Sequence, residues 1–254
     1  MRRLLLSVFI SLCVVAMSGC STFSFPSSFT YQEVPTQTFT IATWSKLTDP
    51  QQAVRIYIEG DGYAYNAHGT PSYDPTSRDD LVRRLAFGDP APNVIYLARP
   101  CQYVKSTHCQ PLYWTRVRFS KEVIEAERSA IQALTSSQNL VLIGYSGGAQ
   151  VAGLLAVTEP RLPVKKVITL AGNLDHPAWT QMHRLTALKD SLSLTPYRNK
   201  FAQLPQVHFV GNEDKNIVPT LIKRFADKNA TVIEVNEANH NKGWDKVFDA
   251  IWNQ

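Results

Sequence analysis

The apolar positions along the chain predict alternating strands and helices. Short runs of branched and aromatic residues are typical of buried strands, whereas apolar residues three or four positions apart are typical of one helix face. This alternation, over a length that suits one domain, predicts an α/β protein with a mostly parallel, twisted central sheet and helices on both faces. We expect the first two strands to form a hairpin. The predicted strands cover residues 38–47, 53–59, 93–98, 139–145, 164–171, 206–210 and 231–235, and the predicted helices cover residues 77–87, 120–134, 150–157, 218–228 and 244–252.

A glycine-flanked serine follows the strand that ends at Tyr145, in the sequence GYSGG around Ser146. The spacing G-x-S-x-G is typical of a sharp turn from strand to helix, where the residues two before and two after the serine nearly touch. Such a turn exposes the serine hydroxyl and points the N–H of Gly147 to where an oxyanion could develop. A glycine-rich turn with an incidental serine is the alternative, but the flanking strand and helix patterns favour a nucleophile.

The first residues indicate export. Arg2 and Arg3 precede an apolar stretch over residues 4–16, which is short for a transmembrane helix and typical of a secretion signal. The segment ends in MSGC and resembles a bacterial lipobox, in which the cysteine, here Cys20, is lipidated and becomes the mature N-terminus. Methionine replaces the more usual leucine, and ordinary cleavage with Cys20 left as a free thiol is the alternative. Ser21 resembles the sorting pattern for the outer membrane, so an exported lipoprotein at its periplasmic face is expected.

A tether and a cap-like insertion frame the predicted domain. After a signal peptide over residues 1–19, residues 20–37 carry serine, threonine and proline without a helical period, which is typical of a flexible tether. The folded domain is expected over residues 38–254. Within it, residues 172–204 form a long polar excursion of the kind that often covers a site, so we expect a small cap there.

The charge argues against one class of partner. Loss of residues 1–19 removes two arginines and no acidic residue, so the formal net charge falls from +5 to +3. This mild charge, without a run of lysine and arginine interleaved with aromatics, argues against nucleic acid. The membrane, through the lipid on Cys20, is the partner that the sequence indicates, and no obligate protein partner is inferred.

Two cysteines remain in the mature domain. Cys101 and Cys109 are expected to form a disulfide in an oxidising periplasm. A metal site formed by these cysteines and His108 is the alternative, but it lacks a fourth ligand at useful spacing.

The order of motifs resembles that of the α/β-hydrolase superfamily. A strand, the GYSGG turn, an acidic residue and a histidine follow one another over nearly the whole mature chain. Within the superfamily, the chain is similar to a group of bacterial lipoprotein hydrolases that share EGDG, ARPC, GYSGG and a late histidine. The resemblance implies the α/β-hydrolase fold and a Ser-His-Asp triad, with no metal or organic cofactor needed.

The resemblance places the triad acid just after the strand that ends at Val210. The stretch GNEDKNIVP is similar to the family's G-x-x-D followed by V-P, with one extra residue before the proline, and makes Asp214 the predicted acid. Its role would be to accept the histidine Nδ1–H, fix the tautomer and stabilise the imidazolium. Asp175, which follows the preceding strand, and Glu213 are alternatives. His240, in NEANHNKGW after the last predicted strand, is the predicted base, with a polar turn histidine as its alternative.

The second oxyanion donor should come from the loop after the strand ending at Glu59. Many family members carry His-Gly there, whereas this chain has EGDG, so the N–H of Asp61 resembles the usual donor. A carboxylate close to a developing oxyanion would oppose it, so Glu59 should point away and be paired, or its charge should be suppressed. Arg99 is the expected partner of Glu59, either in substrate binding or as a salt bridge between loops. Tyr145 is a third candidate for substrate binding, and Trp114, Trp179, Tyr63 and Tyr65 could line an apolar pocket.

These residues predict a serine hydrolase that cleaves an ester or related acyl bond of a small-molecule or lipid substrate. His240 would take the proton of Ser146, and the N–H groups of Gly147 and Asp61 would stabilise the oxyanion of the tetrahedral intermediate. Two alternatives stay open, because fold does not imply function. The chain could be a binding or scaffolding lipoprotein without turnover, or an acyltransferase that excludes water.

Overall fold

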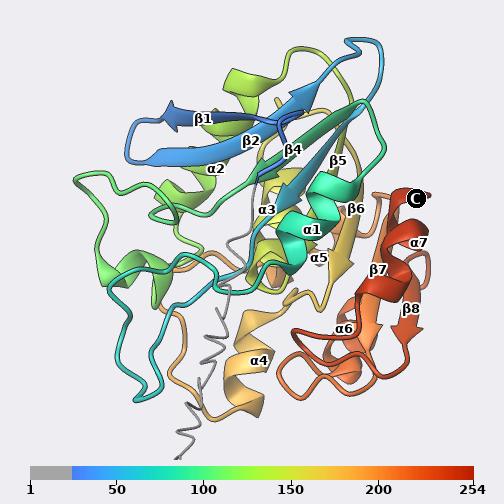
Figure 1. Ribbon diagram of the computed structural model, residues 1–254. Coiled ribbons are helices and arrows are strands. Elements are labelled where there is room, and N and C mark those ends of the chain that lie inside the picture. The colour runs from blue at the N-terminus through green and yellow to red at the C-terminus, as the bar shows by residue number, and fades with distance from the viewer. Residues whose placement is uncertain (1–24) are drawn as a thin grey trace, which may run out of the picture.

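An eight-stranded sheet runs through the centre of the protein (Figure 1). The computed structural model describes residues 25–254. The strands lie in the order β1-β2-β4-β3-β5-β6-β7-β8, antiparallel at the β1 and β2 edge and parallel from β4 to β8. The predicted α/β class with a mostly parallel sheet is therefore confirmed. The strands are β1 (Thr30–Pro35), β2 (Thr40–Leu47), β3 (Val54–Ile58), β4 (Asn93–Leu97), β5 (Leu140–Tyr145), β6 (Val164–Leu170), β7 (Gln206–Gly211) and β8 (Thr231–Val235).

Helices cover both faces of the sheet, as the pattern predicts (Figure 1). One core cluster joins the sheet to α2, α3, α5 and α6, and the other joins it to α1 and α7. The two-residue period of β3 shows how a strand serves both clusters, because Ile56 and Ile58 belong to the first and Tyr57 to the second. The helices are α1 (Leu81–Gly88), α2 (Lys121–Leu134), α3 (Gly147–Thr158), α4 (His176–Met182), α5 (Arg198–Phe201), α6 (Pro219–Phe225) and α7 (Phe248–Trp252), with 3-10 turns η1 (Pro111–Trp114), η2 (Thr195–Tyr197) and η3 (Asp245–Val247).

The predicted hairpin of the first two strands is wrong. Strand β4 lies between β2 and β3, antiparallel to the former and parallel to the latter. The connection from β2 to β3 instead crosses the start of β4, where the Asn93 side chain accepts hydrogen bonds from the N–H groups of Thr48 and Asp49, both at 3.0 Å. Neighbours in sequence are therefore not neighbours in this part of the sheet.

The predicted tether contains a strand. Residues 30–35 form β1, which pairs with β2 along its whole length, so the expectation of a flexible segment is wrong there. Only Val34 of this strand is buried. An edge strand with one buried side chain carries no alternation of apolar and polar residues, which explains why the pattern did not predict it.

The export signals fall outside the described residues. The predicted signal peptide over residues 1–19 and the lipidation site Cys20 stay predictions for that reason. Within residues 25–254, no helix is both long enough and apolar enough to cross a membrane.

The disulfide expected from the sequence is present. Cys101 and Cys109 are bonded, with their Cα atoms 5.6 Å apart. The bond closes the loop between β4 and η1, and both cysteines are therefore engaged with each other rather than with His108. The predicted insertion over residues 172–204 contains α4, η2 and α5, of which α4 lies beside the carboxyl ends of the strands (Figure 1).

Candidate active site

The turn from β5 to α3 has the tight geometry that its glycines predict. Ser146 adopts φ 50° and ψ −119° as the residue before α3. A Cβ atom on Gly144 would lie 2.5 Å from the carbonyl oxygen of Gly148, and one on Gly148 would lie 2.4 Å from that of Ile58. No carbon fits at these distances. Gly144 is thus required by the turn itself, and Gly148 by the backbone of the neighbouring strand β3.

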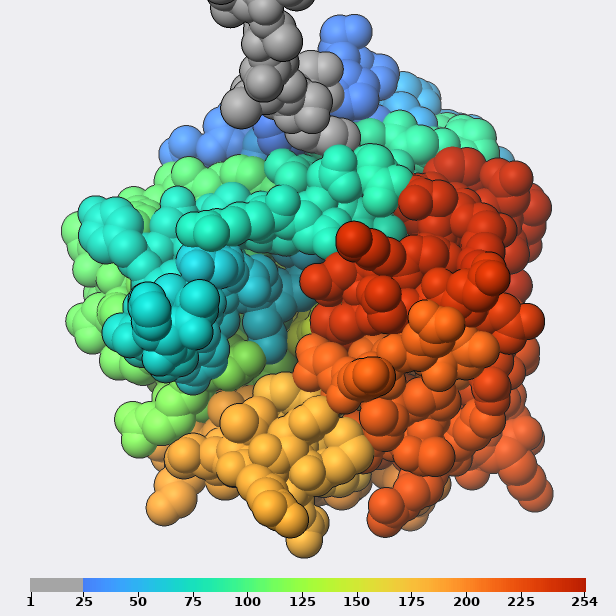
Figure 2. All heavy atoms as spheres, turned by 60° about the horizontal axis from the view of Figure 1, so that its bottom comes forward, coloured from blue at the N-terminus to red at the C-terminus, as the bar shows by residue number. Residues whose placement is uncertain are grey.

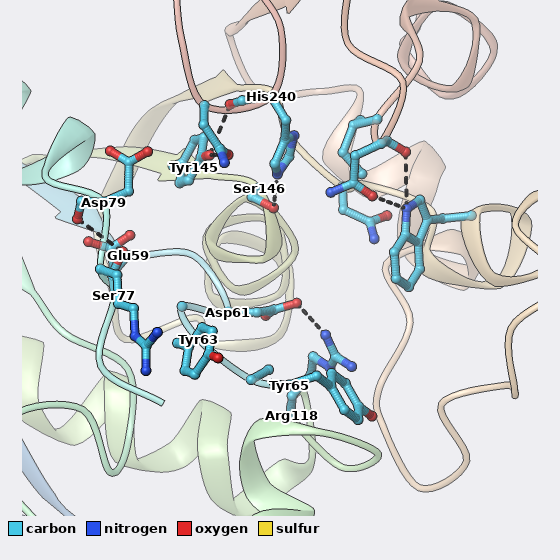
Figure 3. Close-up of a pocket in the computed structure, with 18 residues that line it drawn as sticks. Glu59, Asp61, Tyr63, Tyr65, Ser77, Asp79, Arg118, Tyr145, Ser146 and His240 are labelled. Carbon is cyan, nitrogen blue, oxygen red and sulfur yellow. Dashed lines mark hydrogen bonds and ion pairs between the residues drawn. The ribbon is translucent and has the colours of Figure 1, made fainter. Parts of the chain in front are cut away.

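Three predicted side chains meet above the carboxyl ends of β5 and β7. The Nε2 atom of His240 lies 3.0 Å from Oγ of Ser146, and its Nδ1 atom lies 2.9 Å from Oδ2 of Asp214. Figure 3 shows the imidazole directed at the serine hydroxyl from the loop after β8. Carboxylate, imidazole and hydroxyl form a continuous hydrogen-bonded chain, which is the geometry that general-base activation of a serine requires.

The Asp214 carboxylate is fixed by its own loop. Its Oδ1 atom accepts hydrogen bonds from the N–H groups of Asn216 and Ile217, at 2.8 and 2.9 Å, and its side chain is fully buried. The two alternative acids lie elsewhere. Asp175 caps α4 by accepting from the N–H of Ala178 at 3.1 Å, and Glu213 is exposed to solvent. Asp214 is the carboxylate that contacts the histidine.

Tyr145 holds the loop that carries the histidine. Its hydroxyl lies 2.9 Å from the backbone oxygen of His240 and 3.0 Å from Oδ1 of Asn241. The tyrosine ring also packs beside the imidazole, with 5.4 Å between ring centroids. Tyr145 lines the cavity as the substrate-binding prediction requires, but its anchoring of the loop was not foreseen from the sequence.

The predicted pairing of Glu59 with Arg99 is wrong. The Arg99 guanidinium instead contacts Glu127 at 2.9 Å and Asp61 at 3.5 Å. Glu59 accepts hydrogen bonds from the Tyr96 hydroxyl at 2.7 Å and from the N–H of Gly60 at 2.9 Å.

The alternation of side chains along neighbouring strands explains this difference. Ile58 of β3 lies opposite Leu97 of β4, and both belong to the core cluster on the α2 and α3 side. Glu59 therefore points to the opposite face, whereas Arg99, two residues after Leu97, returns to the α2 face. The number of residues from each strand to Glu59 and to Arg99 thus places the two side chains on opposite faces of the sheet.

Burial favours the neutral form of Glu59, which is one of the two arrangements that the sequence allowed for a carboxylate in this position. Desolvation raises the pKa of its carboxyl to about 7, against the opposing effects of the Tyr96 and Gly60 hydrogen bonds. Because the unfolded carboxyl titrates at its ordinary, lower pKa, the unfolded state ionises first as the pH rises. The free energy of unfolding should thus fall between about pH 4.5 and pH 7, by about 3 kcal/mol for this one group.

The variant Glu59→Gln isolates this contribution. We expect the wild type to lose about 3 kcal/mol more stability than the variant between pH 4.5 and pH 8 in urea unfolding titrations. Glu127, whose pKa burial also raises to about 7, is present in both proteins and cancels from the difference. Identical pH dependences for the two proteins would show that Glu59 is ionised in the folded state.

The two predicted oxyanion residues lie against each other. A Cβ atom on Gly147 would be 2.1 Å from Oδ1 of Asp61, so the Asp61 carboxylate packs directly on the Gly147 backbone. The same carboxylate forms an ion pair with Arg118, whose Nη1 atom lies 2.6 Å from Oδ2 (Figure 3). Arg118 was not among the residues singled out in the sequence. No motif marks it, because its partner lies 57 positions away along the chain.

A cavity of about 370 Å³ opens over the serine. Figure 2 shows this face, where the loop after β3, the insertion over residues 172–204 and the loops of the C-terminal quarter surround a hollow. Trp179 of α4 lines it and donates a hydrogen bond to the backbone oxygen of Asn216 at 3.1 Å, which links the insertion to the Asp214 loop. Trp114, expected to line the pocket, is buried in the core instead. Other lining residues include the predicted substrate-binding residue Glu59 together with Asp61, Tyr63, Tyr65, Ser77, Arg78, Asp79, Arg118 and Asn173.

Among residues 25–254, no group of three or more histidine, cysteine, aspartate or glutamate side chains is arranged to hold a metal ion. The cavity wall carries the Ser146 hydroxyl and the His240 imidazole together with charged, amide and aromatic side chains.

Comparison with known proteins places the fold. No family model matches the sequence, and no curated protein matches it. Solved structures do match, although their identity is low. VinJ superposes with a TM-score of 0.65 at 10% identity, covering 88% of this chain and 97% of that chain. A serine hydrolase from the bacterium Cycloclasticus zankles gives 0.62 at 13%, over 89% and 95% of the two chains.

An α/β fold family hydrolase from Bacillus anthracis gives a TM-score of 0.58 at 13% identity and covers 89% of this chain and 97% of that chain. These matches cover nearly all of each matched chain. The chain has the fold of the α/β-hydrolase superfamily.

Proposed function

We propose that this protein is a serine hydrolase that cleaves an ester or related acyl bond through a covalent acyl-enzyme. The observation that supports the proposal is the chain of hydrogen bonds from Asp214 through His240 to Ser146, at 2.9 and 3.0 Å, beside a cavity. A serine hydroxyl is a weak nucleophile at neutral pH and needs an adjacent base whose orientation is fixed by a third group. The contacts of these three side chains meet that requirement.

The first half of the reaction forms the acyl-enzyme. As Oγ of Ser146 attacks the acyl carbon, Nε2 of His240 takes the hydroxyl proton, and Asp214 stabilises the imidazolium. The carbonyl oxygen becomes the oxyanion, which the N–H groups of Gly147 and Asp61 would stabilise. The bond from the acyl carbon to the leaving oxygen then breaks, and His240 gives its proton to the departing alcohol.

The second half releases the acyl group. His240 takes a proton from water as the water oxygen attacks the acyl-serine carbon, and the same N–H groups stabilise the second oxyanion. The bond to Oγ breaks, the proton returns from His240 to Ser146, and a carboxylic acid leaves. An acceptor alcohol in place of water would make the enzyme an acyltransferase.

Labelling with a fluorophosphonate probe tests the proposal. We expect the wild type to be labelled at neutral pH and Ser146→Ala to remain unlabelled. Ser77→Ala is the matched control, because Ser77 lines the same cavity but donates its hydroxyl to the backbone oxygen of Asp79 at 3.1 Å. It should be labelled like the wild type.

The other outcomes separate the competing functions. A wild type that is not labelled and releases no acid from a chain-length series of nitrophenyl esters would favour a non-catalytic binding lipoprotein. Transfer of the acyl group to added glycerol in preference to water would favour an acyltransferase. Release of free acid supports the hydrolase.

The location proposed for this hydrolase is the cell envelope, anchored by lipid at Cys20. The support is the lipobox-like sequence that ends at this residue and the disulfide of the folded domain, since disulfides persist in oxidising compartments. Cys20→Ser should move the protein from the membrane fraction to the soluble fraction of cells. Retention in the membrane fraction would rule out this anchor.

A further inference from the structure

The loop that follows β3 places a negative charge where the proposed reaction needs positive potential. The Asp61 carboxylate packs on Gly147, the residue directly after the nucleophile Ser146. Charge develops on the substrate carbonyl oxygen beside this point, and a second negative charge a few ångströms away raises the energy of that state. The backbone N–H of Asp61 would help the reaction, whereas its side chain would oppose it.

Two arginines balance this carboxylate. Arg118 approaches Oδ2 to 2.6 Å, and its side chain is 8% exposed. Arg99 lies further away, 3.5 Å from Oδ1, and its Nε atom is engaged with the fully buried Glu127 at 2.9 Å. Arg118 is therefore the closest countercharge of Asp61.

The Arg118 guanidinium is held in place before any substrate arrives. Its Nε–H donates to the backbone oxygen of Thr115 at 2.6 Å, and the backbone oxygen of Arg118 itself accepts from Nη2 of Arg99 at 2.5 Å. The next residue is tied to the insertion, where the N–H of Leu192 donates to the backbone oxygen of Phe119 at 2.9 Å. Such fixed charges stabilise a transition state without reorganising during the reaction.

We propose that Arg118 is a positioning residue of the oxyanion site, which neutralises the Asp61 carboxylate beside Gly147 so that the loop can serve as a donor. This inference rests on the proposed serine hydrolase function. It assigns to the Asp61–Arg118 ion pair the task of making an acidic loop compatible with an anionic transition state.

A double-mutant cycle tests the inference on nitrophenyl ester hydrolysis. Arg118→Gln should lower kcat about 10- to 100-fold with a smaller change in KM, because the exposed charge of Asp61 acts on the transition state. Asp61→Asn keeps the backbone N–H, removes the charge and supplies the second single variant of the cycle, with which the double variant is compared. The double variant should recover most of the activity that the single arginine change removes.

Recovery in the double variant is the decisive result. If Arg118 only tethered the loop, removing Asp61 as well would restore nothing, and equal kcat values for Arg118→Gln and the double variant would overturn the inference. So would a kcat of Arg118→Gln equal to wild type. The control is Arg116→Gln, which removes an exposed arginine 3.8 Å from Asp190 and should leave kcat unchanged.

Two further measurements keep the outcomes separate. If Arg118→Gln does not fold, Arg118→Lys takes its place in the test, because lysine keeps the positive charge but lacks the planar guanidinium. The inference then expects kcat within about threefold of wild type, whereas a tethering role of the guanidinium contacts predicts a large loss. Fluorophosphonate labelling of the wild type, with Ser146→Ala as control, reports on the hydrolase function itself. If the wild type is not labelled, the proposed hydrolase function fails. If the wild type and the variants are labelled but their kcat values differ from those expected, only the role of Arg118 fails.

Discussion

Replacing His240 with alanine is expected to lower kcat for ester hydrolysis by about 10⁴-fold or more, with the fold intact. The imidazole is the group that lies 3.0 Å from the Ser146 hydroxyl, so its removal leaves the nucleophile protonated. The loop should survive the change. Its backbone is held independently by the Tyr145 hydroxyl and by Trp244, whose Nε1–H donates to the backbone oxygen of Asn239 at 2.9 Å.

When two residues act in the same catalytic step, removing both lowers kcat about as much as removing either one. The double variant Ser146→Ala/His240→Ala should therefore be no slower than either single variant. His68→Ala, which removes an exposed histidine from the loop after β3, should match wild type. Steady-state rates on a nitrophenyl ester, with circular dichroism to verify folding, compare these four variants with the wild type. A kcat for His240→Ala within tenfold of wild type would contradict the assigned base.

Replacing Asp214 with asparagine is expected to lower kcat by about 10⁴-fold without unfolding the protein. Oδ1 of this residue accepts from the N–H groups of Asn216 and Ile217, so an asparagine would keep its carbonyl oxygen there and turn its amide toward the histidine. The amide N–H would then donate to Nδ1 of His240. That tautomer carries its proton on Nε2 and cannot accept the proton of Ser146.

The two other candidate acids are the controls for this prediction. Asp175→Asn keeps an oxygen that can cap α4, and Glu213→Gln changes an exposed side chain, so both should retain kcat within a few-fold of wild type. Both variants also preserve side-chain size. A loss of activity in Asp175→Asn with full activity in Asp214→Asn would reassign the acid.

The site residues could be predicted because each carries a local signal. Ser146 sits in a glycine-spaced turn, and strand ends that are plain in the sequence place Asp214 and His240 near it. The choice of Asp214 over Asp175 and Glu213 came from the resemblance to the α/β-hydrolase superfamily. The carboxyl ends of parallel strands meet at one edge of the sheet, so residues just past them come together.

Other features depend on contacts that no local pattern encodes. Strand β1 buries only Val34, and β2 pairs with β4 because of the order of strands in space rather than along the chain. Arg118 lies in an irregular segment, and its role depends on the Asp61 loop folding against it. Such pairs between loops are set by the tertiary structure and carry no sequence period.

The central claim is that Ser146 attacks the substrate and carries its acyl group. Its most direct test is rapid acid quenching of the protein during turnover of nitrophenyl acetate, followed by peptide mapping with mass spectrometry. We predict that one acetyl group is attached to the peptide that contains Ser146 and that Ser146→Ala acquires none. Turnover without an adduct on this peptide, or undiminished turnover by Ser146→Ala, would contradict the account.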